Sequence, residues 1–426
     1  MKLQNRPLLR NIFSSGASAL LSAGLTALTV RVYVGSLGME RYGLWATLTV
    51  VVTLIHLSSF GVGPALTTRA AELDKQGERH AIAETLVASY AAVFALGAVA
   101  ILVGYLGALP IARFFGLKGA FLTEGAELVP WVAVLAIASL GAQLVTSTLV
   151  GLGRADLASA QGLAAKVLQF GLSILMLDQG FGVKALVWGN TLGVLIQIVI
   201  GETSLRRRLQ VAWGVKTGPR FSRLRPLLRL GTSLAFGSSF QIGLAPFGKW
   251  LLAQSAGLEA VSIYEIGWSV SMQVRALAAA AFQPTVPEFS RHKGFPERTA
   301  QLLTRSYRSL ALVFTPLFAC VGLSLPWLLR LWLGVRYSDE LLVPTSLFLL
   351  GAWLSMFGLP PYYCLLGEGD GARLVFAQAL QSVLNVLLSI ALWAMFPYSP
   401  AWAALAMGLS VMSSSIYLIR AAGRVR

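Results

Sequence analysis

Long apolar stretches, separated by short polar connections, run through nearly the whole chain. A bilayer core of about 30 Å requires about 20 apolar residues in a helix, and runs of that length occur twelve times in the 426 residues. They predict membrane-spanning helices over residues 11–35, 42–67, 84–108, 127–151, 157–177, 183–203, 230–254, 260–285, 307–333, 340–366, 372–396 and 399–419. The expected fold is therefore an all-α integral membrane protein with twelve transmembrane helices.

The connections between these runs are short and hold Gly, Pro or charged residues, as in Gly153-Arg154-Ala155-Asp156. We therefore expect no extramembrane domain large enough for separate chemistry. A second apolar run follows the first directly, which favours a retained first helix over a cleaved signal peptide.

The composition agrees with a membrane protein. Apolar residues make up 56% of the chain and charged residues 12%, against roughly 45–50% and about 25% in soluble domains. In so apolar a chain, a net charge of +16 is expected at lipid headgroups, so membrane lipids and not nucleic acid are the expected partners. The two cysteines lie in apolar runs without nearby histidine clusters, so no metal site, disulfide or cofactor is expected.

The distribution of Lys and Arg predicts the orientation. With the N-terminus in the cytoplasm, the inner segments hold 24 of the 34 cationic residues and the outer segments hold 7. Cytoplasmic loops carry the excess of Lys and Arg in membrane proteins. We therefore expect a multi-pass protein of the cytoplasmic (inner) cell membrane with both termini in the cytoplasm.

An internal repeat divides the chain into two halves. The segment Arg206 to Arg229 holds eight cationic residues and no acid, with six predicted spans on either side. Gly38-Met39-Glu40 is matched by Gly257-Leu258-Glu259 at an offset of 219, and Gly151-Leu152-Gly153 by Gly367-Glu368-Gly369 at an offset of 216. These matches predict an N-terminal six-helix lobe over 1–205, a basic cytoplasmic linker over 206–229 and a C-terminal six-helix lobe over 230–426.

The even number of spans in each half fixes the expected symmetry. Both halves enter the membrane in the same direction, so they are related by a pseudo-two-fold axis along the membrane normal. Parallel repeats of this kind are typical of transporters that rock two bundles about a central cavity.

Four cationic residues inside or near the spans are candidates for substrate binding. Lys166 and Arg275 are expected near mid-depth, where a charge is costly unless it faces a cavity or a partner. Arg31 and Lys249 are expected nearer the outer ends, where long side chains can also reach lipid headgroups. Ion pairs or carbonyl contacts between helices are the structural alternative for Lys166 and Arg275.

Glu265 and His56 are candidates for ion coupling, because each places a titratable group inside a span. A structural salt bridge is the alternative for Glu265, and a hydrogen-bonded packing histidine is the alternative for His56. No enzyme is expected: Gly248-Lys249 continues into Trp250 instead of the Ser or Thr of a P-loop, and no long outer loop holds the paired acids of a glycosyltransferase.

Several motifs resemble those of the polysaccharide and O-antigen flippases of the multidrug/oligosaccharidyl-lipid/polysaccharide exporter superfamily. They are Val34-Gly35-Ser36-Leu37-Gly38-Met39-Glu40-Arg41-Tyr42-Gly43-Leu44-Trp45, Ser59-Phe60-Gly61-Val62-Gly63-Pro64-Ala65-Leu66, Gly257-Leu258-Glu259-Ala260-Val261-Ser262-Ile263-Tyr264, Pro287-Glu288-Phe289-Ser290 and Leu331-Trp332-Leu333-Gly334. The resemblance implies two six-helix lobes, alternating access and a lipid-diphosphate-linked glycan as cargo.

One departure concerns the seventh span. Members of that family often have an acid followed by a cation before Leu-Leu, whereas this chain has Gly248-Lys249-Trp250-Leu251-Leu252. The cation is present and the adjacent acid is missing, which puts carboxylate-based ion coupling at this position in doubt.

The resemblance and the residues together predict a flippase. It would translocate a polyprenyl-diphosphate-linked oligosaccharide by alternating access for surface polysaccharide biosynthesis, with other polysaccharide-assembly proteins as further partners. Cationic residues in a hydrated cavity would compensate the diphosphate charge. The alternatives are a multidrug/cation exporter of the same superfamily, which would favour an anionic cavity, and a membrane-embedded glycan polymerase or ligase, which would need acid and base residues near the outer face.

Overall fold

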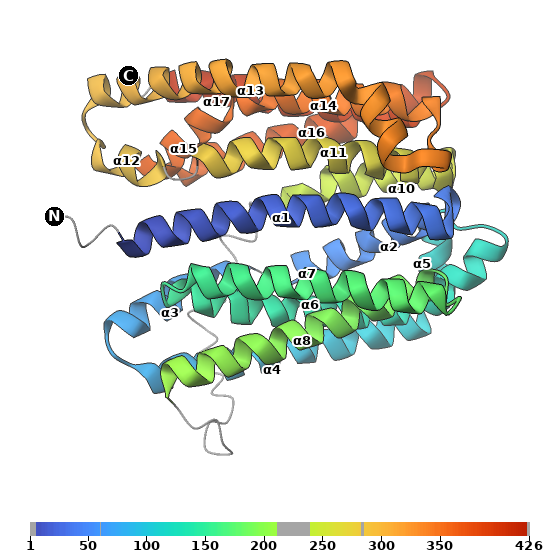
Figure 1. Cartoon of the computed structure of the whole chain (residues 1–426), viewed down its shortest axis with the longest axis horizontal. Helices are drawn as coiled ribbons and strands as arrows, with labels where there is room; N and C mark the ends of the chain where they lie inside the picture. The colour runs from blue at the N-terminus through green and yellow to red at the C-terminus, as the bar shows by residue number, and fades with distance from the viewer. Residues whose placement is uncertain (1–5, 60, 211–238, 283–284, 424–426) are drawn as a thin grey trace. The chain divides into compact units, whose positions relative to one another are not determined.

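The computed structural model of the chain describes residues 6–59, 61–210, 239–282 and 285–423, and every regular element in these ranges is a helix (Figure 1). Most of the predicted linker 206–229 and the start of the predicted span 230–254 lie outside the described residues. Among the described residues, seven helices are long and apolar enough to cross a membrane, or nine if each of two bent pairs forms one span. Each of the twelve predicted ranges overlaps a helix.

The described residues of the first half of the chain form eight helices. They are α1 (Arg6–Leu37), α2 (Met39–Leu57), α3 (Val62–Lys75), α4 (Arg79–Leu106), α5 (Ala108–Phe114), α6 (Ala120–Gly151), α7 (Ala155–Asp178) and α8 (Val183–Leu209).

The second half, from Phe240 onward, contains α-helices and short 3-10 turns. They are η2 (Phe240–Gly243), α10 (Ala245–Ser255), α11 (Leu258–Phe282), α12 (Val286–Arg291), α13 (Pro296–Leu333), η4 (Gly334–Arg336), η5 (Asp339–Leu341), α14 (Leu342–Met356), α15 (Leu359–Glu368), α16 (Gly371–Met395) and α17 (Pro400–Gly423).

These helices form two compact units. Unit 1 comprises Met1–Thr29 and Thr47–Ser239, and unit 2 comprises Val30–Ala46 and Phe240–Arg426. Both α1 and α2 are thus divided between the units. The lobe boundaries expected from the sequence run at 205 and 230, and they remain a prediction.

In unit 1 the central helix is α6, which packs against α3, α4, α5 and α8. It is apolar on all sides, and residues such as Leu128, Val132 and Leu149 are buried along its length. A helix that is apolar all round is expected in an interior or a membrane. Helices α7 and α8 form an adjoining pair.

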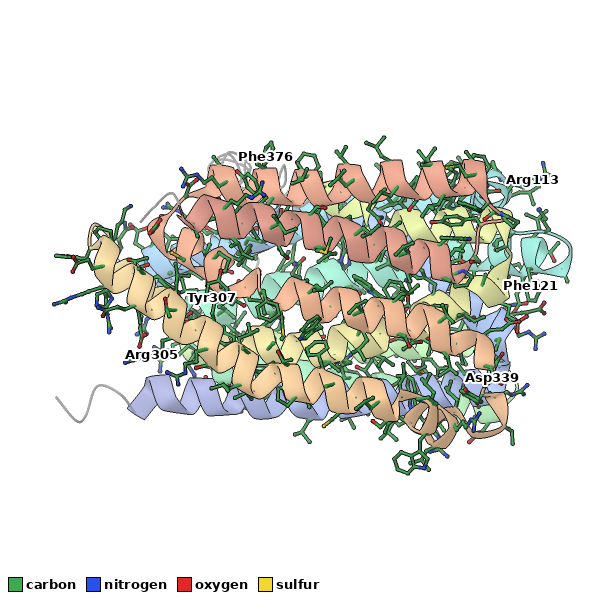
Figure 2. All side chains as sticks on the ribbon, turned by 90° about the horizontal axis from the view of Figure 1, so that it is seen from above. Arg113, Phe121, Arg305, Tyr307, Asp339 and Phe376 are labelled. Atoms are coloured by element: carbon green, nitrogen blue, oxygen red, sulfur yellow. The ribbon has the colours of Figure 1, made fainter. Side chains whose placement is uncertain are left out.

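In unit 2, α14 packs against α11 and α17, and α17 also packs against α16. The long helix α13 crosses the unit from end to end: Figure 2 shows Arg305 and Tyr307 near its start and Asp339 beyond its far end. Leu323, Trp327 and Leu331 recur every four residues on α13 and are all exposed, which is the pattern of a lipid-facing stripe.

The helical conformation is interrupted between η2 and α10, just before Pro246. Leu244 leaves the helical conformation (φ −99°, ψ −122°), and Pro246 stands in the first turn of α10, where a missing N–H is tolerated. The Asn385 side chain of α16 donates a hydrogen bond to the freed Gly243 carbonyl at 2.7 Å. This contact satisfies a backbone acceptor that water cannot reach in a bilayer.

The internal repeat is visible in the backbone turns. Gly38 and Gly257 both have a left-handed conformation, with φ of 82° and 86°. Three further pairs at offsets of 215 to 217 share a positive φ: Gly77 with Gly294, Gly119 with Gly334, and Gly153 with Gly369.

The two Gly-X-Glu turns also contact one another within unit 2. A Cβ on Gly43 would lie 1.9 Å from the Leu258 carbonyl oxygen, so α2 and α11 meet backbone to backbone here. The Ser262 hydroxyl donates a hydrogen bond to the Met39 carbonyl. In the internal repeat, with its offset of 219, Gly43 corresponds to Ser262 and Met39 corresponds to Leu258. The contact of Gly43 with Leu258 and the contact of Ser262 with Met39 are therefore equivalent. The contact is therefore reciprocal, as at a two-fold axis.

Candidate functional site: charged side chains within the helices

Lys249 and Glu265 form an ion pair in unit 2. Lys249 lies on α10 and Glu265 on α11, and the Nζ to Oε2 distance is 2.7 Å. The Lys249 side chain is 10% exposed and the Glu265 side chain is 23% exposed. The sequence nominated the two residues for separate roles, and the structure brings them together. The carboxylate missing next to Lys249 in the sequence thus comes from the following helix.

Arg275 lies ten residues after Glu265 on α11, about 15 Å farther along the helix axis. Its Nε donates a hydrogen bond to the Ser355 hydroxyl of α14 at 3.1 Å. Within the described part of the chain, Arg275 makes no ion pair. Its guanidinium therefore keeps donors and a full positive charge for a ligand.

Lys166 lies on α7 in unit 1 and is exposed. Its ammonium donates a hydrogen bond to the Ser22 hydroxyl of α1. A hydroxyl satisfies a donor without neutralising the charge, so Lys166 remains cationic in this contact.

Arg31 and His56 occupy different surroundings. Arg31 is exposed on the part of α1 that belongs to unit 2. His56 on α2 is half-buried in unit 1, and its Nε2 lies 3.3 Å from the Ala136 carbonyl oxygen of α6. Because a carbonyl only accepts, this contact requires a proton on Nε2. The structure thus gives His56 the hydrogen bond of a packing histidine, and its proposed part in ion coupling is untested.

One buried acid, Glu202 on α8, was missed by the sequence analysis. The Tyr90 hydroxyl of α4 donates a hydrogen bond to its Oε1 at 2.8 Å, and Arg206 Nε lies 4.0 Å from its Oε2. Glu202 lies at the end of the predicted span 183–203, next to the basic segment. An acid at that position is expected to be a surface residue. Only the packing of α4 on this turn reveals its burial.

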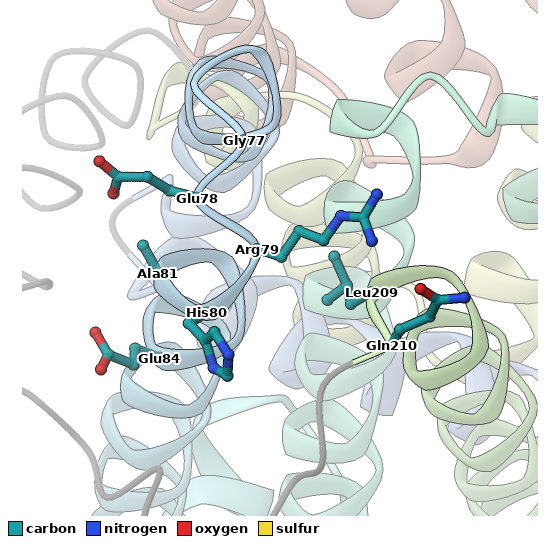
Figure 3. A pocket seen from close by; sticks show the side chains of 8 residues that line it. All are labelled: Gly77, Glu78, Arg79, His80, Ala81, Glu84, Leu209 and Gln210. Atoms are coloured by element: carbon teal, nitrogen blue, oxygen red, sulfur yellow. The ribbon is translucent and has the colours of Figure 1, made fainter.

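A pocket of about 470 Å³ opens in unit 1 between the α3–α4 turn and the end of α8. Figure 3 shows Arg79 pointing toward Leu209 and Gln210, with Glu78 and Glu84 on the opposite side. The lining mixes both signs of charge and includes none of the six residues nominated from the sequence. It is a surface hollow rather than a single-sign binding site.

The fold is similar to that of solved transporters over nearly the whole chain. The inward-facing conformation of a multidrug resistance MATE family transporter of the MOP superfamily matches with a TM-score of 0.79 and 17% identity, covering 97% of this chain and 98% of that one. The outward-facing conformation of such a transporter matches with a TM-score of 0.69 and 16% identity, covering 99% and 96%. The chain therefore has the fold of these multi-pass membrane transporters.

A third solved structure is a MOP superfamily transporter from Pyrococcus furiosus described as having a binding pocket of reverse polarity (TM-score 0.64, 15% identity, covering 98% of this chain and 95% of that one). No curated protein matches the chain. The profile of the polysaccharide biosynthesis protein family matches residues 37–341, so the chain belongs to that family. This confirms the resemblance seen in the sequence motifs.

Proposed function

We propose that this transporter is a flippase. It carries a polyprenyl-diphosphate-linked oligosaccharide across the cytoplasmic membrane by alternating access, for surface polysaccharide biosynthesis, and it is not an enzyme. The proposal includes twelve transmembrane helices in two six-helix lobes, a pseudo-two-fold axis along the membrane normal and both termini in the cytoplasm. The family match and the transporter fold support the general role.

The observation that carries the proposal is the state of Arg275. A cation inside a span that is hydrogen-bonded to a hydroxyl instead of a carboxylate is costly to keep, and it is suited to an anionic ligand. A planar guanidinium also matches the paired oxygens of a phosphate group. Lys166, held by a hydroxyl, provides a second candidate for the same purpose in unit 1.

A multidrug/cation exporter would require an uncompensated acid. Glu265 is the acid that the sequence offers inside a span of unit 2, and it is paired with Lys249 at 2.7 Å. The cationic excess at Arg275 therefore favours an anionic cargo over a cationic drug.

The test is flipping of a polyprenyl-diphosphate-linked oligosaccharide by the purified full-length protein in vesicles that contain no glycan-synthesis enzymes. Arg275→Gln is expected to lower the rate at least tenfold, and Arg275→Lys to retain a larger share of it because it keeps the charge. Arg298→Gln is the matched control, since Arg298 lies over the exposed Phe295 ring at the start of α13. Absence of flipping by the wild-type protein, or undiminished flipping by Arg275→Gln, would contradict the proposal.

A further inference from the structure

Lys249 cannot serve as an anion site while Glu265 holds it. At 2.7 Å the ammonium and the carboxylate neutralise one another, so an approaching phosphate meets a pair with no net charge. A lysine that binds cargo must first lose this internal partner. While the ion pair is intact, Lys249 cannot bind cargo. If the pair separates, cargo binding by Lys249 and ion coupling by Glu265 become linked.

Accessibility decides which partner responds first. The Lys249 side chain is 10% exposed and has little freedom to leave. The Glu265 side chain is 23% exposed and is the more exposed partner of the pair, although its Oε2 atom is buried. When the carboxylate takes up a proton, it loses its charge and the Coulomb attraction that holds the ammonium. The buried Lys249 then loses the negative charge that lay 2.7 Å away, and an anion of the cargo can restore that compensation.

We propose that the phosphate groups of the cargo replace Glu265 at Lys249, and that each such replacement is accompanied by uptake of one proton on the Glu265 carboxylate. The balance is simple: one proton moves from water to Glu265, Lys249 stays protonated, and no covalent bond of the cargo changes. This inference rests on the proposed function and adds a regulated anion site to it.

The other groups around the pair do not titrate in the relevant range. Tyr33 and Tyr42, on α1 and α2, and Tyr264 and Tyr398 interact electrostatically with the pair or with each other. A phenol is neutral near pH 7. Helix α14 and turn η2 contain no Asp, Glu, Lys, Arg or His.

Most other charges on the neighbours of α10 and α11 stand near helix ends, including Glu40 and Arg41 at the start of α2, whereas Arg305 and Arg308 lie within α13. Arg373 and Arg420 stand at the ends of α16 and α17 that are remote from Tyr398. On α15, Glu368 is the final residue. Asp339 in η5 lies 3.6 Å from Arg330 of α13, and both side chains are exposed, as is the neighbouring Glu340. Glu265 is thus the carboxylate that lies directly against Lys249 in this cluster.

The experiment measures binding and proton uptake together. The probe is a short-chain prenyl diphosphate ester of a single hexose, because both phosphates of such a diester keep their charge from mildly acid to neutral pH. The purified full-length protein in lipid nanodiscs is titrated with the probe by calorimetry in buffers of different ionisation enthalpy, which reports the number of protons taken up per probe bound.

For the wild-type protein we expect affinity to rise toward acid pH, by up to about tenfold per pH unit where one proton is taken up per probe. Glu265→Gln should bind the probe with the same affinity at every pH, equal to the affinity of the wild type at acid pH. Its binding should take up no proton. Glu202→Gln is the matched control, since it removes a buried carboxylate in unit 1 and should keep the wild-type pH dependence.

The double variant Lys249→Gln/Glu265→Gln guards against misfolding, because it removes both charges and leaves neither one buried alone. It should fold and bind weakly, with no pH dependence. A wild-type affinity that does not change with pH, or a Glu265→Gln variant that keeps the wild-type slope, would refute the exchange while the flippase proposal stands. A wild-type protein that does not bind the probe at any pH would overturn both.

Discussion

At the residue scale, the charged side chains within the helices divide into compensated and uncompensated groups. Lys249 has a carboxylate at 2.7 Å, whereas Arg275 and Lys166 contact hydroxyl groups. An ion pair lowers the cost of burial and neutralises the charge, whereas a hydroxyl contact satisfies a donor and leaves the charge in place. The cations therefore differ in what their removal should do to stability.

Breaking the Lys249–Glu265 pair from one side should destabilise the protein more than removing both charges. Lys249→Met leaves the Glu265 carboxylate without its cation, with an expected loss of about 3 kcal/mol in the free energy of unfolding. Lys249→Met/Glu265→Gln should recover most of that loss. Thermal unfolding of the purified variants in one detergent measures the difference. A double variant no more stable than Lys249→Met would show that the pair contributes little.

Replacing Lys249 by arginine tests charge against shape in transport. Lys249→Arg keeps the positive charge and should retain much of the flipping rate, whereas Lys249→Met keeps the apolar stem and should lose most of it. The rates are measured in reconstituted vesicles and normalised to protein content. Equal, near-wild-type rates would mean that Lys249 has no contact with the cargo.

At the element scale, the helices of unit 2 depend on two close backbone contacts that a hydropathy pattern does not reveal. One is the break at Leu244, stabilised from α16 by Asn385. The other is the approach of Gly43 to the Leu258 carbonyl. Pro246 and the glycines in the sequence indicate where the chain can bend or pack closely, but their partners lie far away along the chain.

Asn385→Leu should weaken the break between η2 and α10. The substitution keeps the approximate size of the side chain and removes the donor to the Gly243 carbonyl, leaving a buried acceptor unpaired at a cost of about 1–3 kcal/mol. Ser413→Ala is the control, because the exposed Ser413 hydroxyl bonds to a carbonyl of its own helix. Thermal unfolding of both variants is the measurement, and equal stability would contradict the role given to Asn385.

Gly43→Ala should disrupt the contact between α2 and α11, because its Cβ would lie 1.9 Å from the Leu258 carbonyl oxygen. We expect a loss of about 3 kcal/mol or failure to accumulate in the membrane. Gly35→Ala, on α1, meets no atom within 4 Å and should be neutral or stabilising by up to about 1 kcal/mol. The amounts of both variants in isolated membranes, and their melting temperatures, give the comparison. Similar behaviour of the two variants would be inconsistent with the packing described.

At the scale of the whole molecule, the sequence predicted the class of fold and the family, and the comparisons confirm both. Apolar runs reveal helices that cross a bilayer because each run reports on its own surroundings. Pairings such as Lys249 with Glu265 or Tyr90 with Glu202 depend on which helices pack together, and one sequence does not contain that information. For the same reason the sequence assigned separate roles to two residues that form one unit.

The orientation in the membrane is a prediction for the whole chain. In a background with Cys320→Ser and Cys364→Ala, a single cysteine at Arg298 should react with an impermeant reagent only from the cytoplasm, and one at Lys118 only from outside. This follows from the excess of Lys and Arg in the inner segments. A probe at Lys216, outside the described residues, should also react from the cytoplasm. Labelling at Arg298 from outside would contradict the expected orientation.

The reciprocal contact between the two Gly-X-Glu turns can be compared with a contact between two identical subunits. A half-length chain could have made the same contact twice with an identical copy, as symmetric dimers do. Identical subunits must carry the same residue at both places, whereas a fused chain is free of that constraint. Here one place holds Gly43, which lets two backbones touch, and the other holds Ser262, whose hydroxyl bonds across to Met39. The single chain thus forms a contact with two different residues that two identical subunits could not form.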